Sequence, residues 1–138
     1  MIDVLVALVV LSIGLLGLAG LQATGLRYNH GAYLRTQATL LAYDMADRMR
    51  ANQTGVNAGD YDSIGFTTSL AKDCSLSTVT CTPAEIAQYD AYEWSQDSRN
   101  LLPKGTGTVT KTGSLYTITV SWDDAGSGTM SFATTFQP

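Results

Sequence analysis

Few side chains in this sequence have types and positions suited to chemistry, and the most unusual is the carboxylate of Asp3. It stands at the start of MIDVLVALVVLSIGLLGLAG, in which the 18 residues from Val4 to Leu21 carry no charge. As a helix this run would be about 27 Å long, close to the roughly 30 Å hydrocarbon core of a bilayer. A carboxylate at the edge of hydrocarbon needs either a positively charged partner or solvation by lipid headgroups.

The two cysteines, Cys74 and Cys81, lie near each other in the segment CSLSTVTC. No histidine is close in sequence, and two thiols are too few for a typical structural metal site. A disulfide fits better than a metal site if this part of the protein lies in an oxidising compartment. The alternative is a pair of buried free thiols in a cytosolic protein.

The other polar candidates indicate no catalysis. Asp123 and Asp124 lie in DDAGSG, which offers too few carboxylates for calcium and is typical of a turn. His30 is the only histidine, and no nucleophile is placed beside it. Asn52 begins an Asn-Gln-Thr glycosylation pattern, but its position favours a helix stop. We therefore expect no catalytic, cofactor-binding or metal-binding residues and no enzymatic activity.

Charge is distributed unevenly along the 138 residues, whose net charge is −4. Residues 51–138 contain four basic and nine acidic side chains. Binding to nucleic acid depends on Lys and Arg contacts to phosphates. The acidic balance therefore excludes nucleic acid as a partner of this part of the chain.

The hydrophobic pattern predicts one long helix from the N-terminus to residue 52. Its first part is apolar on all sides, as in a membrane span. Its second part is amphipathic, with one apolar face at helical spacing. That face comprises Leu34, Ala38, Leu41, Met45 and Met49. We therefore divide the chain into a transmembrane or filament-core half of the helix (1–25), an amphipathic half (26–52) and a globular head (53–138).

The head combines a short helix with a small sheet, so the predicted fold class is α+β. Residues 53–82 lack periodicity and are predicted to form a loop. Thr82, Pro83 and Glu85 form a helix-start signature, which predicts a helix over residues 83–100. From residue 105 the period changes to two, which predicts a three-stranded antiparallel meander with a turn over residues 123–128. The amphipathic half of the long helix is expected to cover the apolar face of this sheet.

The opening residues resemble the N-terminal helix of type IV pilins and the related pseudopilins. Met1, Ile2 and Asp3 match the Leu-Ile-Glu of those proteins, so Asp replaces the usual Glu and has a shorter reach. The glycine, N-methylated aromatic residue and hydroxyl residue that precede this motif in the family are absent here. We therefore expect the sequence to begin about two residues inside the mature protein.

Two later stretches sharpen this resemblance. GLQATGLRYNHGAYLRTQATLLAYDMADRMRAN and CTPAEIAQYDAYEWSQDSRNLLPKGTGTV resemble the PilV family of minor pilins, the type IV pilus modification proteins. The resemblance implies the type IV pilin fold and a role in assembling pili and in twitching motility. It implies other minor pilins, the major pilin and a tip adhesin as partners, with residues 1–25 in the inner membrane. The implied location is the bacterial inner membrane, with a periplasmic head, and the pilus.

By the same resemblance, Asp3 is an assembly contact that pairs with an N-terminal amine. Gly14, Gly17 and Gly20 would allow close helix packing and local unwinding as the helix moves from the bilayer into a filament. The alternative is that these small residues have no role beyond membrane anchoring.

Two other functions remain open at this stage. One is a minor pseudopilin of a type II secretion system, which shares the N-terminal motif. The other is a secreted binding domain or small enzyme that follows a signal peptide. Against the second, no basic segment precedes the apolar run, which continues directly into the amphipathic helix.

Overall fold

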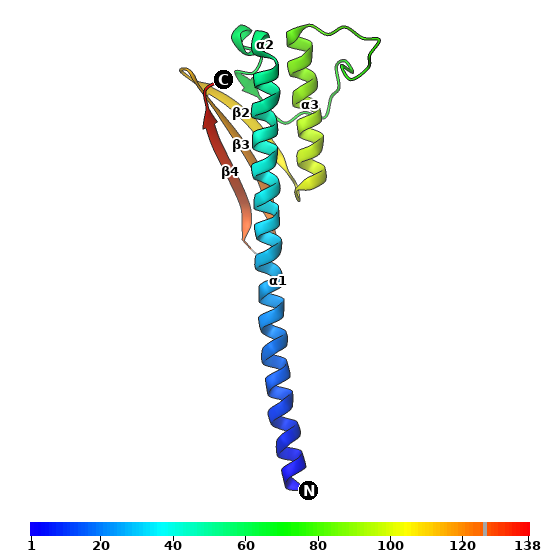
Figure 1. The fold of residues 1–138 in the computed structure, drawn as a ribbon, viewed down its shortest axis with the longest axis vertical. Coiled ribbons are helices and arrows are strands. Elements are labelled where there is room, and N and C mark those ends of the chain that lie inside the picture. Colours follow the sequence, from blue (N-terminus) through cyan, green and yellow to red (C-terminus); the bar gives the residue numbers. More distant parts are fainter. Residues whose placement is uncertain (126) are drawn as a thin grey trace. The chain divides into compact units, whose positions relative to one another are not determined.

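The computed structural model describes residues 1–125 and 127–138. Residue 126, which falls in the turn predicted over residues 123–128, lies outside the described residues. The chain divides into two compact units, residues 1–33 and residues 34–138. The elements run in the order α1 (Ile2–Ala51), α2 (Gln53–Ala58), β1 (Ser63–Ile64), α3 (Pro83–Leu101), β2 (Thr106–Thr112), β3 (Leu115–Asp124) and β4 (Gly128–Phe136) (Figure 1).

Helix α1 provides the whole first unit and the first element of the second. Within the first unit, residues 1–30 are all exposed, so this part of the helix buries nothing within the chain. In the second unit the predicted apolar face is buried, and Ala42 and Ala46 extend it. The long N-terminal helix packed on a small antiparallel sheet, which the sequence predicted, is therefore present.

A polar side chain marks the end of α1. The Asn52 side chain accepts a hydrogen bond from the main-chain N–H of Gly55, so that it caps a further short helix, α2. Gly59 ends α2 with φ at +88°, a left-handed conformation that glycine adopts without strain. The predicted loop over residues 53–82 was therefore wrong for two stretches, α2 and β1, which are too short to carry a periodic signal.

Helix α3 begins as the sequence predicted. The Thr82 hydroxyl accepts a hydrogen bond from the Glu85 N–H, and the Glu85 carboxylate accepts one from the Thr82 N–H. This reciprocal capping box, with Pro83 in the first turn, satisfies main-chain donors that have no partner inside the helix.

The sheet has the order β1-β2-β3-β4, with every neighbouring pair antiparallel. Four strands replace the predicted three because the two-residue strand β1 pairs with β2, Ser63 opposite Thr110. Strand β3 alternates strictly, with Tyr116, Ile118, Val120 and Trp122 buried and the residues between them partly exposed. The sheet therefore has one apolar face and one face rich in Thr and Ser.

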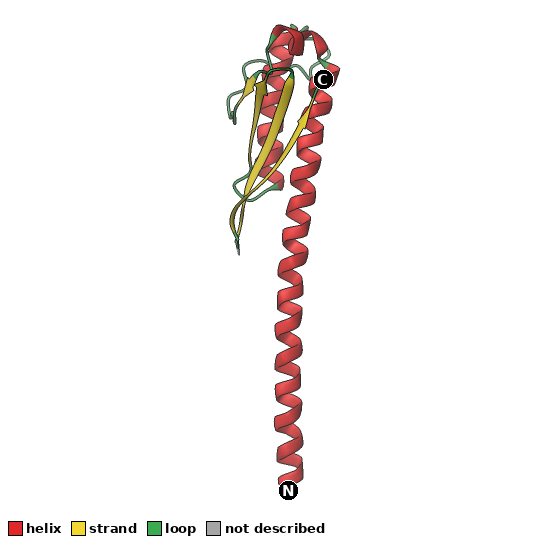
Figure 2. Ribbon diagram, turned by 90° about the vertical axis from the view of Figure 1, so that its left-hand side faces the viewer, coloured by secondary structure: helices red, strands yellow, loops and turns green. Residues whose placement is uncertain are grey.

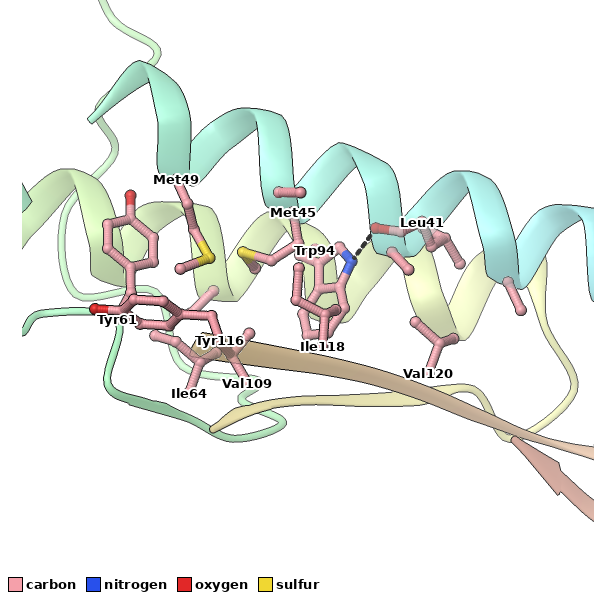
Figure 3. Close-up of a cluster of buried hydrophobic side chains, with 14 of the residues drawn as sticks. Leu41, Met45, Met49, Tyr61, Ile64, Trp94, Val109, Tyr116, Ile118 and Val120 are labelled. Atoms are coloured by element: carbon pink, nitrogen blue, oxygen red, sulfur yellow. Dashed lines mark hydrogen bonds between the residues drawn. The ribbon is translucent and has the colours of Figure 1, made fainter. Parts of the chain in front are cut away.

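Helices α1 and α3 lie against the apolar face of the sheet (Figure 2). Trp94 of α3 is fully buried in the core that the two helices and the sheet enclose. Its indole N–H donates a 2.8 Å hydrogen bond to the Leu41 carbonyl of α1 (Figure 3). A Cβ on Gly107 of β2 would lie 2.2 Å from the Trp94 ring, so this glycine makes room for the indole. Trp94 thus connects α1, α3 and the sheet within a core that also buries Tyr61, Tyr116 and Trp122.

Candidate assembly surfaces

The first unit has an extended exposed apolar surface. By length and composition α1 could cross a membrane, and its most apolar 18-residue window has a mean hydropathy of 2.8 and no buried residue. Large side chains along it, such as Leu8, Leu16 and Leu21, are between 55% and 73% exposed. Apolar surface of this extent marks a membrane or protein contact, because water disfavours it strongly.

Two side-chain hydroxyls within this apolar helix have partners inside the helix. The Ser12 hydroxyl donates to the Leu8 carbonyl at 2.7 Å, and the Thr24 hydroxyl donates to the Gly20 carbonyl at 3.0 Å. Such hydroxyls therefore need no water, which makes the segment compatible with a lipid or protein interior. Asp3 lies exposed in the first turn, where its charge also complements the helix dipole.

The three glycines predicted to loosen the helix all lie on its surface. A Cβ at Gly14, Gly17 or Gly20 would meet nothing within 4 Å. Nothing inside the chain therefore requires glycine there, and the proposed roles in close packing and unwinding remain predictions that concern other molecules.

The second unit joins α1 to α3 through Arg48. Its guanidinium lies 2.8 Å from a carboxylate oxygen of Asp44, 3.0 Å from Glu93 and 3.3 Å from Asp90. Burial alone would lower the pKa of Arg48, but hydrogen bonds to Glu93 and Asp44 outweigh it, so the pKa is raised. Arg48 stays charged, and it ties the end of α1 to the middle of α3.

Asp90 is the most buried acid of this network and the one most dependent on its partners. The Tyr61 hydroxyl donates a 2.5 Å hydrogen bond to Asp90, and the Asn52 side chain donates one to Tyr61 at 3.1 Å. Burial raises the pKa of Asp90, although the bonds from Tyr61 and Arg48 act in the opposite direction. Burial also raises the pKa of Tyr61, and the bond to Asp90 adds to that shift.

The sequence analysis missed this network because its members lie far apart in the chain. Asn52 was predicted as a helix stop, and α1 does end at Ala51. Asn52 also caps α2 with its side chain, is only 8% exposed and donates to the Pro83 carbonyl. Arg48 and Asp90 are separated by 42 residues. The available signal was an arginine at the edge of the apolar face of α1 and an aspartate on the apolar face of α3.

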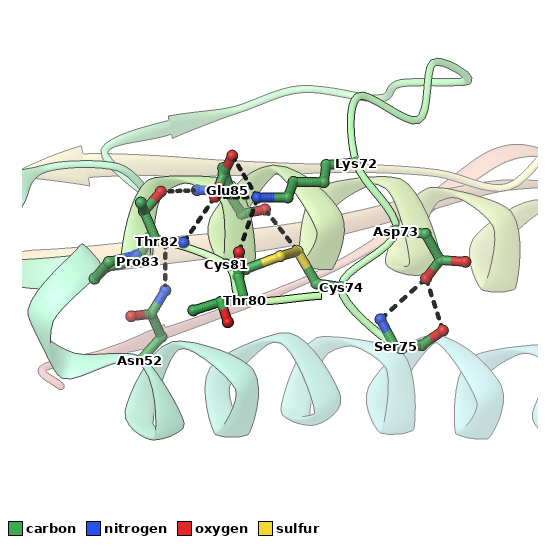
Figure 4. The surroundings of a disulfide bond; sticks show 10 residues. All are labelled: Asn52, Lys72, Asp73, Cys74, Ser75, Thr80, Cys81, Thr82, Pro83 and Glu85. Carbon is green, nitrogen blue, oxygen red and sulfur yellow. Dashed lines mark hydrogen bonds and ion pairs between the residues drawn. A yellow bond between two sulfur atoms is a disulfide. The ribbon is translucent and has the colours of Figure 1, made fainter. Parts of the chain in front are cut away.

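The disulfide between Cys74 and Cys81 closes a seven-residue separation in the long loop before α3. Beside it, the Lys72 ammonium donates to the Thr80 carbonyl at 2.8 Å and to the Glu85 carboxylate at 2.9 Å (Figure 4). The Thr82 main-chain bond and then the Lys72 bond lower the pKa of Glu85. A loop without regular secondary structure is thereby attached to the capping box of α3.

Other residues considered from the sequence form no reaction centre. His30 is exposed on α1, and Asp123 at the end of β3 pairs with Lys104 at 2.7 Å. Within residues 1–125 and 127–138, no group of three or more His, Cys, Asp or Glu side chains could hold a metal ion.

An exposed apolar N-terminal helix continuing into a small α+β head is the architecture of a pilin. The sequence profile named Tt1218-like (Type IV pilin Tt1218) matches residues 20–92, just over half of the chain, and the chain belongs to this family of type IV pilins. No curated protein and no solved structure matches the chain. Type IV pilins are structural subunits, and membership in this family indicates that the chain assembles with other pilins.

We expect the Tyr61→Phe substitution to lower the free energy of unfolding by about 1.5–3 kcal/mol at pH 7, the range for hydrogen bonds to charged groups. The loss should shrink as the pH falls to 4. Because the pKa of Asp90 is already raised, its ionisation costs stability as the pH rises, and losing the Tyr61 bond increases that cost.

Tyr89→Phe is the matched control, because it removes a hydroxyl bonded to the more exposed Glu93. Urea unfolding of the full chain in detergent at pH 4 and pH 7 measures both variants. Equal losses at the two pH values for Tyr61→Phe would contradict a role through the Asp90 charge.

We expect Cys74 and Cys81 to be oxidised to each other in the native protein. Replacing both by Ser should lower the free energy of unfolding by about 2.5 kcal/mol in the chain-entropy model for a loop of this size. Thiol labelling of the unfolded chain before and after reduction checks the pairing. Complete labelling without reductant would show that no disulfide forms.

Proposed function

We propose that this chain is a minor pilin of the PilV type that helps to initiate and assemble type IV pili. The observation that carries the proposal is the contrast between the two units. The second unit buries its own core, whereas residues 1–30 are exposed throughout and the most apolar 18-residue window of α1 has a mean hydropathy of 2.8 and no buried residue. Such a helix requires an apolar environment, and a bilayer before assembly and a bundle of pilin helices afterwards would both supply it.

The proposed location is the bacterial inner membrane, with the helix spanning it once and the head in the periplasm, and then the pilus at or near its tip. The disulfide supports a periplasmic head, because disulfides persist in oxidising compartments. The proposed partners are other minor pilins, the major pilin and a tip adhesin, together with inner-membrane lipid around residues 1–25. N-terminal methylation and a contribution to twitching motility belong to the same proposal.

Asp3 is the proposed assembly contact. Its carboxylate would pair with the N-terminal amine of a pilin once lipid headgroups no longer solvate it. Such a pair compensates the cost of placing a charge beside hydrocarbon. The same contact would fix the axial position of the helix, because Asp3 carries the only side-chain charge before Arg27.

We expect Asp3→Ala to leave membrane insertion intact, because the span becomes more apolar. Its incorporation into pili should fall about tenfold, equivalent to about 1.4 kcal/mol of lost pairing free energy. Immunoblots of sheared pili and of membranes measure both effects. Asp3→Glu is the matched control, since it keeps the charge. Equal amounts of Asp3→Ala and wild-type protein in sheared pili would rule out this role.

Deleting the gene should reduce the number of surface pili more than their length, because initiation rather than elongation loses a component. Electron microscopy of pili in a strain that cannot retract them measures number and length separately. Unchanged piliation together with a defect in protein secretion would instead assign the chain to the type II pseudopilins. Unchanged piliation with normal secretion would contradict both roles.

A further inference from the structure

Strand β4 forms an edge of the sheet. It pairs with β3 along nine residues, and within the part of the chain that the structure describes no strand lies on its other side. An edge strand presents main-chain N–H and C=O groups without partners, and these can bind a strand from another chain.

The register identifies which main-chain groups of β4 point outward. The Asp123 N–H bonds the Pro103 carbonyl, on the β2 side of β3. The main-chain N–H and C=O groups of successive residues in a strand point alternately to its two neighbours. Those of Trp122, and of every second residue before it, therefore point toward β4. Their partners in β4, Met130, Phe132, Thr134 and Phe136, are therefore bonded to β3. The outward groups belong to Thr129, Ser131, Ala133 and Thr135.

These four outward-facing residues are all exposed. Among the described residues, none of their main-chain N–H groups has a hydrogen-bond partner outside the sheet. The strand GTMSFATTF also contains no charge and no proline, the usual devices that prevent edge pairing.

The opposite edge of the sheet is protected. Strand β1 is two residues long, and the Lys111 main-chain N–H beside it bonds the Asp62 carbonyl. The Lys111 ammonium also pairs with the Asp62 carboxylate at 3.0 Å. The short length of β1 and the charges of Lys111 and Asp62 thus oppose strand pairing at that edge. Strand β4 is nine residues long and carries no charge.

The core is incompletely covered beside β4. Met130, Phe132 and Phe136 pack against the core but stay partly exposed, although their neighbours in β3 are buried. A further strand would extend the sheet and cover these three side chains, as apolar burial favours.

We propose that β4 accepts an extended strand from another pilin chain, which adds to the sheet as a fifth strand. The added strand would alternate apolar residues, placed beside Met130 and Phe132, with small hydroxyl residues that continue the Thr and Ser face. The proposal rests on the assembly role above and specifies how the head would bind its partner.

A second copy of this chain fits this edge poorly. Strand β4 and the residues of α1 within the second unit run in the same direction (Figure 1). Antiparallel pairing of two β4 strands would therefore make these parts of α1 antiparallel in the two copies. Two copies anchored in one membrane by residues 1–25 would present the start of their second units from the same side, which disfavours antiparallel pairing of two β4 strands. The strand that we propose therefore comes from a different chain.

Amide hydrogen exchange tests this proposal. The full chain is purified in detergent, alone and in complex with other pilins extracted from membranes of a piliated cell. In the complex, the amides of Ser131, Ala133 and Thr135 should exchange at least about tenfold more slowly than in the chain alone, because hydrogen bonding protects them. The amides of Phe132 and Thr134 act as internal controls, since β3 protects them in both samples.

Ala133→Pro is the matching variant, because proline removes an outward N–H while an edge position tolerates it. It should lower recovery of the complex at least about tenfold, equivalent to about 1.4 kcal/mol. Ala133→Thr is the control, since it adds side-chain bulk but keeps the N–H, and it should bind normally. Unchanged exchange of the Phe132 and Thr134 amides in Ala133→Pro shows that the sheet remains folded.

A complex that forms without slower exchange at the three edge amides would overturn the strand addition and leave the pilin role intact. Slower exchange in the chain alone, rising with its concentration, would assign the edge to a second copy and overturn the partner named here. Failure to recover any pilin with the chain, together with unchanged piliation in the deletion strain, would overturn the proposed function and this inference with it.

Discussion

The first 30 residues are exposed along their whole length, and most of that surface is apolar. An apolar helix of this length cannot remain in water, so the free energy of its burial must come from lipid or from other proteins. The second unit, by contrast, buries most of its own apolar face, and only Met130, Phe132 and Phe136 beside β4 stay partly exposed. One chain therefore combines a unit that has its own core with a helix whose apolar surface must be buried by other molecules.

Within the second unit, polar as well as apolar contacts hold α1 and α3 together. Trp94 donates to a carbonyl of α1 from within the core. Arg48 also joins α1 to three acids of α3, which are Asp90, Glu93 and, at 3.9 Å, Asp97. Removing one member of such a partly buried network costs more than its pairing contributes, because the remaining charges lose their partners. These contacts therefore fix the position of α1 against α3 as well as stabilising the packing of the two helices.

The sequence predicted the elements whose signals are local. The apolar spacing from Leu34 to Met49 and the Thr82–Glu85 capping box predicted the two long helices, and the period of two predicted β2, β3 and β4. The structure confirms these elements. Strand β1 and helix α2 were missed because two and six residues show no period. The bonds from Arg48 and Tyr61 to Asp90 were missed because only the tertiary fold brings these residues together. The roles of Asp3 and the glycines concern other molecules and stay predictions.

Cysteine accessibility along α1 tests directly whether other pilins bury the N-terminal helix. A single cysteine placed at Leu15, and another at Thr108 on the exposed sheet face, would be probed with a maleimide that does not cross membranes. In sheared pili we expect Thr108→Cys to label readily, whereas Leu15→Cys should label only after detergent dissociates the filament. Rapid labelling of Leu15→Cys in intact filaments, or absence of the chain from them, would show that the helix is not buried by other pilins.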